Sequence, residues 1–501
     1  MKEGIIMKKL MTLALAAAMM LGAATGANAI DFKAKGQWIM DFNYGMHGNF
    51  GDSKAATNSG FKRNSNQEDE FEAMQRVRLQ LDAVASEALS GTVFFEIGDQ
   101  FWGKGNDGGA LGADGKVVEL KRAYIDWMVP QTDLKVRMGI QGLALPAFTT
   151  NASQIFDDDV AAVTLNYQFN ENVGLTAFWA RPYNDNNGYS YGNGHGKWGQ
   201  NYMDNMDMFA VLLPLTFDGV KVTPWVMYAA MGPGMFDNFD KEPGNAWGRA
   251  SAGMQSGFKG TDWNDSYGNA FWAGVTGEVT YWDPFRIAWD VNYGSASYED
   301  EKMNREGWLA SLLLEYKLDW GTPGIFGWYA SGDDGNVKNG SERLPSIAGA
   351  GNFTSFMGDG NLAWGTGYNF YDNNLTYAGT WGVGLQIADV SFVEDLKHTF
   401  RVAYWGGTNS PSMVKYMGSG VAWDDTTAAQ DGPYLTTNDG LLEFNLVNSW
   451  QIYENLEANL ELGYIVNMMD KDTWDKSYIS EQRNWSKQDA WKAQLIFAYS
   501  F

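Results

Sequence analysis

The chain of 501 residues lacks cysteine altogether and contains only 12 prolines and three histidines. Without cysteine there is no disulfide framework and no thiol chemistry, which excludes the small secreted scaffolds that disulfides hold together. Beyond residue 29, no apolar run approaches the roughly 18 residues that a membrane-spanning helix needs. The sequence therefore does not describe a helical inner-membrane protein.

Positive charge is also scarce, since 36 Lys and Arg stand against 60 Asp and Glu, for a formal net charge of −24. Phosphate binding needs clusters of Lys and Arg, so nucleic acid is not an expected partner. Proton-transfer catalysis needs a histidine beside a nucleophile or an acid, and none of His47, His195 and His398 has one at strand-facing spacing. We expect no enzyme activity, no cofactor and no metal site.

The first 29 residues have the order of a secretory leader. Lys8 and Lys9 precede an apolar run at residues 10–24, and an Ala-Asn-Ala site follows at residues 27–29. Charge, a short hydrophobic core and a small-residue cleavage site define a cleavable signal peptide. We expect residues 1–29 to be removed and residues 30–501 to form one domain.

That domain has the composition of an all-β protein and strict period-two alternation. It is 15% aromatic with 59 glycines, whereas disordered chains are poor in aromatics. From Phe285 to Tyr293, apolar side chains occupy every second position and Arg286, Asp290 and Asn292 lie between them. Residues 32–44, 71–81 and 456–464 repeat this pattern. Successive side chains of a strand point to opposite faces, so each strand has one apolar and one polar face.

The connections decide between a soluble sandwich and a membrane barrel. The alternating segments have about 10 residues or more, the length of a tilted membrane strand. Short connections, such as residues 130–131, 170–172, 218–219, 283–284 and 454–455, alternate with long ones. The long ones are 46–70, 142–159, 184–205, 231–267, 332–375 and 406–440. This predicts a transmembrane antiparallel β-barrel with short periplasmic turns and long external loops. We expect about eighteen strands, or sixteen if segments 93–101 and 325–331 are not strands.

The last segment alternates up to the final residue. One parity holds Trp491, Ala493, Leu495, Phe497, Tyr499 and Phe501. A terminal strand of this kind that ends on Phe resembles the sorting signal of outer-membrane proteins. The resemblance assigns Phe497, Tyr499 and Phe501 to an assembly signal and places the protein in a Gram-negative outer membrane.

At the level of strand pattern, the mature chain resembles the general, trimeric outer-membrane porins. The resemblance implies that the third long loop, residues 142–159, folds into the barrel, so that its carboxylates face basic residues on the opposite wall. The carboxylates would be Asp157, Asp158 and Asp159, and the basic residues Arg76, Arg78, Arg122 and Arg137. It also implies a homotrimer, joined through the outer faces of strands near both termini. Candidate contacts are Phe32, Trp38, Leu79, Leu81 and Phe497.

The inward direction of these arginines also follows from physical chemistry. An arginine that faces lipid at the membrane midplane costs roughly 2–4 kcal/mol, whereas one that faces a wet lumen costs little. Two interpretations remain open: the arginines form a constriction, or they pair along the wall with Glu72, Asp82 or Asp126. The three aspartates could likewise be only a solvated loop end.

The resulting hypothesis is a porin for passive diffusion of small hydrophilic solutes and ions, surrounded by outer-membrane lipid and lipopolysaccharide. Charges on remote loops are screened beyond a Debye length of about 8 Å, so local arginines should outweigh the acidic total. We expect weak anion preference or near neutrality. A non-channel adhesin or anchor is the alternative from another class, and it would need a plugged lumen.

Overall fold

The computed structural model describes most of the predicted barrel domain. The described residues are 30–46, 70–105, 108–113, 115, 118–184, 205–232, 253–256, 258, 267–351, 353–354, 376–416, 434–476 and 487–501. The predicted leader at residues 1–29 lies outside these ranges, as do His47 and His195. Removal of the leader therefore stays a prediction.

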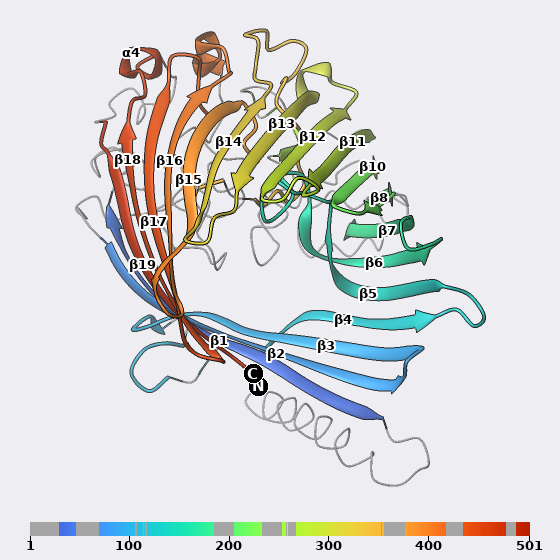
Figure 1. Ribbon diagram of the computed structural model, residues 1–501. Helices are drawn as coiled ribbons and strands as arrows, with labels where there is room; N and C mark the ends of the chain where they lie inside the picture. The colour runs from blue at the N-terminus through green and yellow to red at the C-terminus, as the bar shows by residue number, and fades with distance from the viewer. Residues whose placement is uncertain are drawn as a thin grey trace.

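The described residues form one antiparallel sheet (Figure 1). Its strands are β1 (Asp31–Met46), β2 (Glu70–Ser86), β3 (Leu89–Phe101), β4 (Glu119–Met128), β5 (Leu134–Ala144), β6 (Asp157–Gln168), β7 (Gly174–Asn184), β8 (Asn205–Leu212), β9 (Leu215–Phe217), β10 (Val220–Met231), β11 (Gly268–Val279), β12 (Phe285–Ser297), β13 (Arg305–Tyr316), β14 (Thr322–Ala330), β15 (Thr380–Val393), β16 (Leu396–Gly407), β17 (Gly440–Tyr453), β18 (Leu456–Asn467) and β19 (Ala490–Ser500). The described helices are short: η4 (Glu301–Met303), η5 (Pro411–Tyr416) and α4 (Lys471–Trp474). None of the helices in these ranges is long and apolar enough to cross a membrane.

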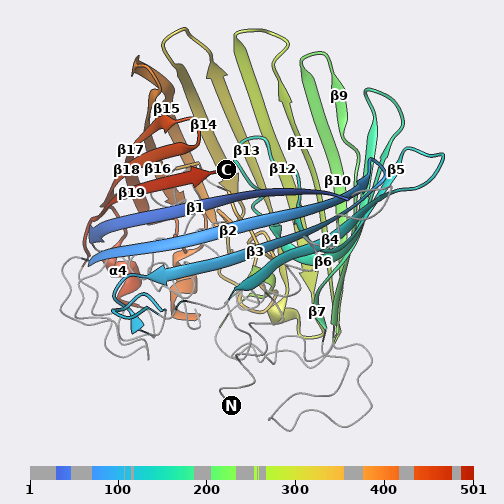
Figure 2. The same cartoon turned by 90° about the horizontal axis from the view of Figure 1, so that it is seen from below.

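The sheet closes into a barrel because β1 pairs with both β2 and β19 (Figure 2). β8 and β9 are two parts of one strand, since both pair with β10 and only Leu213 and Pro214 separate them. Proline has no N–H to donate to a ladder, which accounts for the break. The barrel thus has eighteen strands. This confirms the higher predicted count, and both uncertain segments are strands, β3 and β14.

The alternation of the sequence becomes an apolar outer band and a polar or small inner face. In β12, Phe285, Val291 and Tyr293 are 51%, 49% and 39% exposed on the outside, whereas Ala288 and Asp290 are fully buried on the inside. A closed barrel leaves no strand edge unpaired, and its apolar band matches the hydrocarbon of a bilayer. The protein is a multi-pass β-barrel of the Gram-negative outer membrane.

The predicted alternation of short and long connections is confirmed. At one end of the barrel the joins have two to five residues, as at 169–173, 218–219 and 394–395. At the other end they are longer, as at 102–118 and 145–156. β1 begins and β19 ends on the short-turn side, because Asp31 pairs with Val84 beside the turn between β2 and β3. Because outer-membrane barrels have their short turns on the periplasmic side, we assign this end to the periplasm.

The main apolar core lies inside the barrel, on its long-loop half. Described loop residues pack there against the inner faces of β6 to β18. The loop members are Leu145, Ile155, Phe156, Met254, Phe258, Tyr298, Met303, Leu344, Ile347, Phe353, Tyr377, Ala378, Met413, Val414, Tyr434, Leu435, Met469 and Trp474. The long loops therefore fold inward and fill part of the lumen.

Candidate functional site: the charged interior of the barrel

The four arginines predicted to face inward lie on one side of the barrel wall. Arg76 and Arg78 come from β2, Arg122 from β4 and Arg137 from β5. The side chains of Arg78, Arg122 and Arg137 are 28%, 38% and 30% exposed. Because they point away from the lipid face and still reach solvent, this part of the lumen is open to water.

Arg137 is paired along the wall. Its Nε and a terminal nitrogen donate to the two carboxylate oxygens of Asp126 at 2.7 and 2.8 Å. Lys135 Nζ lies 3.1 Å from the same carboxylate, and the Arg137 guanidinium lies 4.1 Å from the centre of the Tyr124 ring. For Arg137 the structure therefore shows wall pairing, one of the two open interpretations. Paired and stacked, this guanidinium is held flat against the wall.

The cations of β2 and β4 share two carboxylates in a continuous chain. Arg78 Nε donates to Glu96 at 2.7 Å, and Lys121 Nζ lies 3.8 Å from Glu96 and 2.9 Å from Asp159. Arg122 Nε donates to Asp159 at 2.5 Å. Arg76 also acts electrostatically on Glu96. Arg76, Arg78, Lys121 and Arg122 thus gather around the carboxylates of Glu96 and Asp159, and Arg122 also acts electrostatically on Asp157.

The three aspartates require a correction. Asp157, Asp158 and Asp159 are the first residues of β6, not the end of a loop, and they pair with residues 142–144 of β5. Asp159 contacts Arg122 and Lys121 on the neighbouring wall rather than arginines across the lumen. Because three consecutive acids do not alternate with apolar residues, the pattern did not show that the strand already begins at Asp157. The loop between β5 and β6 is residues 145–156.

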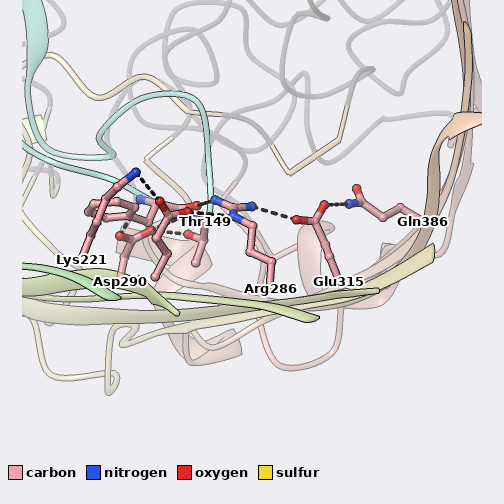
Figure 3. A network of polar contacts seen from close by, with 8 residues as sticks. Thr149, Lys221, Arg286, Asp290, Glu315 and Gln386 are labelled. Carbon is pink, nitrogen blue, oxygen red and sulfur yellow. Dashed lines mark hydrogen bonds and ion pairs between the residues drawn. The ribbon is translucent and has the colours of Figure 1, made fainter. Parts of the chain in front are cut away.

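A second charged row was not predicted as a site. It runs along the inner wall from β10 to β16, near the periplasmic ends of β10 to β13, and Figure 3 shows the part from Lys221 to Gln386. Its members, in order, are Lys221, Glu278, Arg286, Glu315, Gln386 and Arg401, and each contacts the next at 2.8 to 3.2 Å. The sequence predicted that Arg286 faces inward, because it lies between the apolar positions of its strand. It did not predict the contacts.

Gly324 makes the row continuous across β14. A Cβ atom at this position would lie 3.1 Å from Glu315 Cγ and 3.3 Å from Gln386 Cγ. Because glycine has no side chain, the side chains of β13 and β15 meet over the intervening strand, where Gln386 donates to Glu315 at 2.9 Å. A larger residue here would crowd the centre of the row.

The tip of loop 145–156, Phe148 and Thr149, lies against this second row. Backbone N–H groups of Phe148 and Thr149 donate to Asp290 at 2.9 and 2.8 Å, and the Thr149 hydroxyl also donates to Asp290. Arg286 donates to the Phe148 carbonyl at 2.9 Å. The loop therefore leaves β5 and rests on the inner face of β12, and Figure 3 shows Thr149 at its contact with Asp290. This inward course agrees with the expectation from the porin resemblance.

Not all of the interior is open to water. The inner side chains Asp41, Glu443, Glu461, Lys492 and Gln494, from β1 and β17 to β19, are at most 3% exposed. By contrast, Lys221 is 54% and Arg286 33% exposed on the second row. Among the described residues, the charged side chains that reach water thus lie on β2 to β6 and near the periplasmic ends of β10 to β13.

The predicted assembly residues lie at the seam where the barrel closes. Phe497 and Tyr499 face outward on β19, and Phe501 continues the ladder, since its N–H and carbonyl both bond to Gly36 at 3.0 Å. A Cβ atom on residue 36 would lie 2.5 Å from the Phe501 ring. Glycine at this position therefore makes room for the terminal ring against β1.

His398 lies near the start of β16. Its Nδ1 contacts Asn448 Oδ1 at 2.7 Å, next to the Phe392 ring. Within the described ranges, no three His, Asp or Glu side chains gather to hold a metal ion.

Known structures share this architecture over nearly the whole chain. OpdL of Pseudomonas aeruginosa matches with a TM-score of 0.50 at 9% identity, covering 94% of this chain and 99% of its own. A BenF-like porin from Pseudomonas fluorescens Pf-5 matches with a TM-score of 0.50 at 8% identity, covering 94% and 98%. OccK2 (OpdF) of Pseudomonas aeruginosa, in complex with glucuronate, matches with a TM-score of 0.50 at 10% identity and the same coverage.

No protein-family model and no curated protein matches the chain. Sequence identities near 10% show a shared fold only, and the general trimeric subtype stays a prediction. The chain has the closed eighteen-strand barrel fold of outer-membrane porins.

Proposed function

We propose that the protein is a water-filled channel through which small hydrophilic solutes and ions diffuse passively. The observation that carries this proposal is the contrast between an apolar outer band and inward charges that reach solvent, Arg122 and Lys221 among them. Transmembrane barrels with polar lumens conduct in this way. An adhesin or anchor would need a plugged lumen, whereas these inner charges reach solvent.

We further propose weak anion preference. The first charged wall supports it, because Arg76, Arg78, Lys121 and Arg122 gather around Glu96 and Asp159, and the side chains of Arg78 and Arg122 stay partly exposed. On the second row, Lys221 and Arg286 are balanced by Glu278 and Glu315. Charged side chains that line a pore sort ions by sign. A local excess of cations at the accessible wall should therefore outweigh the acidic total of the chain.

Removing the cations of this wall should shift the channel toward cations. We expect the purified protein to give a reversal potential on the anion side, or near zero, in a salt gradient across a planar bilayer. Replacing Arg76, Arg78 and Arg122 together by Ala should move that potential toward cations, because Glu96 and Asp159 then lose three of the positive charges near them. The shift should weaken at high salt, as screening requires.

Arg181→Ala is the matched control. Arg181 pairs with Asp207 at 2.8 Å beside the outward-facing Trp179, so its loss should leave the reversal potential unchanged. As a second measurement, liposome swelling with glucuronate, the compound in the OccK2 structure, should be compared with neutral glucose. Strong cation selectivity that the triple replacement does not change would refute the proposed role of the arginines. An absence of any conductance would refute the channel itself.

We also propose that the barrel assembles as a trimer, an inference from the porin resemblance. The suggested contacts Phe32, Trp38, Leu79, Leu81 and Phe497 lie on the neighbouring strands β1, β2 and β19. Phe32 and Trp38 are 41% and 39% exposed, which gives this face apolar side chains to bury. Native mass measurement in mild detergent should give three copies. A monomer in several detergents would remove this proposal and leave the channel proposal standing.

A further inference from the structure

We propose that Asp290 and Arg286 are positioning residues that fasten the tip of loop 145–156 to strand β12 and thereby set the width of the solute path. The inference rests on the proposed channel function and assigns its aperture to a specific attachment. No contact of either residue with a solute is needed. Each acts through the loop that it holds.

The attachment is built from buried, charge-assisted hydrogen bonds. Asp290 is fully buried, and both of its oxygens are used: Oδ1 accepts from the Phe148 N–H and Oδ2 from the Thr149 N–H and hydroxyl. The Thr149 hydroxyl also lies 2.7 Å from the hydroxyl of Ser311, the direct partner of Asp290 on β13. Hydrogen bonds to a charged acceptor are the strong ones. The tip is therefore held at one place and in one orientation.

Arg286 completes the attachment from the same strand. Its Nε and one terminal nitrogen hold Glu278 and Glu315, and the other terminal nitrogen donates to the Phe148 carbonyl at 2.9 Å. The two carboxylates already hold the guanidinium in place, so its hydrogen bond to the loop costs little further side-chain entropy. The loop tip is thus joined to the whole charged row in Figure 3.

A second loop holds the returning arm of loop 145–156. Phe156 and Ala348 form a parallel bridge, and N–H groups of Ile347 and Ala348 donate to the Ile155 carbonyl. The Ala350 N–H donates to the Ser153 carbonyl at 2.7 Å. The arm is therefore anchored independently of the tip, and loss of Asp290 should release only the tip.

The course of the loop explains why its tip controls the path. From β5 and β6 to β12, the loop forms a chord across the barrel. On one side of the chord, inner side chains of β8, β10 and β11 are buried in the apolar core: Met206, Met208, Trp225, Met227 and Trp272. On the other side lies the wall of Arg78, Glu96 and Arg122. Because the side chains of Arg78 and Arg122 on this wall reach solvent, the proposed solute path runs between the loop and this wall, and movement of the tip changes its width.

Asp290→Asn is the first test. An amide in place of the carboxylate points N–H toward at least one of the N–H donors of the loop and removes the charge. Each lost hydrogen bond to a charged acceptor should raise the undocked population roughly tenfold or more. In single-channel recordings we expect the steady open level to become noisy, with added sublevels. Asp82→Asn is the control, since Asp82 is an inner-wall acid that accepts from Gln80 and Thr92, away from the loop.

A disulfide tests the same point without weakening the fold. The native chain has no cysteine, so Thr149→Cys with Ser311→Cys introduces a single pair. The two hydroxyls are 2.7 Å apart, so the two side chains point toward each other, as those of a disulfide must. We expect the pair to oxidise readily, the oxidised channel to conduct like the native one, and oxidation to restore a steady level in the Asp290→Asn background.

The outcomes separate the two proposals. A native protein that does not conduct refutes the channel. If the native protein conducts but the cysteine pair does not oxidise, or its oxidation blocks conductance, then the tip is not docked in the working channel. If Asp290→Asn is no noisier than Asp82→Asn, Asp290 does not position the loop.

Discussion

Deletion of Phe501 is expected to remove most of the assembled barrel from the outer membrane. The residue closes the seam between the last strand and the first, where its N–H and carbonyl bond to Gly36 at 3.0 Å. Its ring lies 5.2 Å from Trp38 and 6.2 Å from Tyr499, between ring centres. Two ladder hydrogen bonds and a half-buried ring together contribute about 2–4 kcal/mol. An unclosed barrel would leave strand edges in lipid, where no water can satisfy them.

The measurement is the yield of heat-modifiable barrel in outer-membrane fractions, with periplasmic degradation products followed by immunoblot. Phe501→Tyr keeps both the ring and the ladder and should assemble normally. Gly36→Ala places a methyl group within the space of the ring and should reduce the yield. Phe392→Ala removes another aromatic ring, 79% exposed, near the periplasmic turn of residues 394–395, and should change nothing. A normal yield from the Phe501 deletion would show that the C-terminus is not an assembly signal.

Asp333→Ala is expected to loosen the outer loops without opening the barrel. Asp333 lies after β14, is 2% exposed, and accepts hydrogen bonds from Ser341 Oγ and Tyr434 OH, each at 2.6 Å. It thereby joins the connection after β14 to the one before β17. Burial, reinforced by the Asp333 carboxylate, holds the pKa of Tyr434 well above its usual range, so this hydroxyl stays a donor at working pH. Without its acceptor, the buried hydroxyl has no partner.

Loss of two such hydrogen bonds should raise the open population of these loops about a hundredfold. Chymotrypsin should then cut the intact protein within residues 331–379 or 408–439, while heat-modifiability of the barrel is retained. Asp334→Ala is the control, because the neighbouring side chain is exposed and accepts only from the Asn336 N–H at 2.7 Å in the described residues. Equal resistance of both variants would show that Asp333 does not hold the loops together.

Period-two alternation predicts the barrel from the chain alone, because the face to which a strand side chain points depends only on its position along that strand. Side chains two residues apart share a face whatever the strand pairs with. The inward direction of Arg78, Arg122 and Arg137 follows from the same rule and from the cost of placing arginine in lipid. The local pattern failed at Asp157, where three acids in a row hid the start of β6.

The partners of the inner charges could not be inferred in this way. Asp290 holds Thr149 across 141 residues of sequence, and Gln386 reaches Glu315 across 71. Such pairs depend on how the strands are ordered around the barrel and on Gly324 leaving a gap between them. The same holds for Asp159, which pairs with Arg122 on its own side of the lumen.

By itself, the sequence determined the class of fold, the outer apolar band and the inward direction of the arginines, since all of these follow from alternation every two residues along one chain. It left the number of strands at eighteen or sixteen. Only the tertiary structure decided which charges meet, where loop 145–156 lands and which part of the lumen the loops fill. These features arise when strands far apart in sequence come to face one another across a closed barrel. A pattern that repeats every two residues carries no information about such long-range contacts.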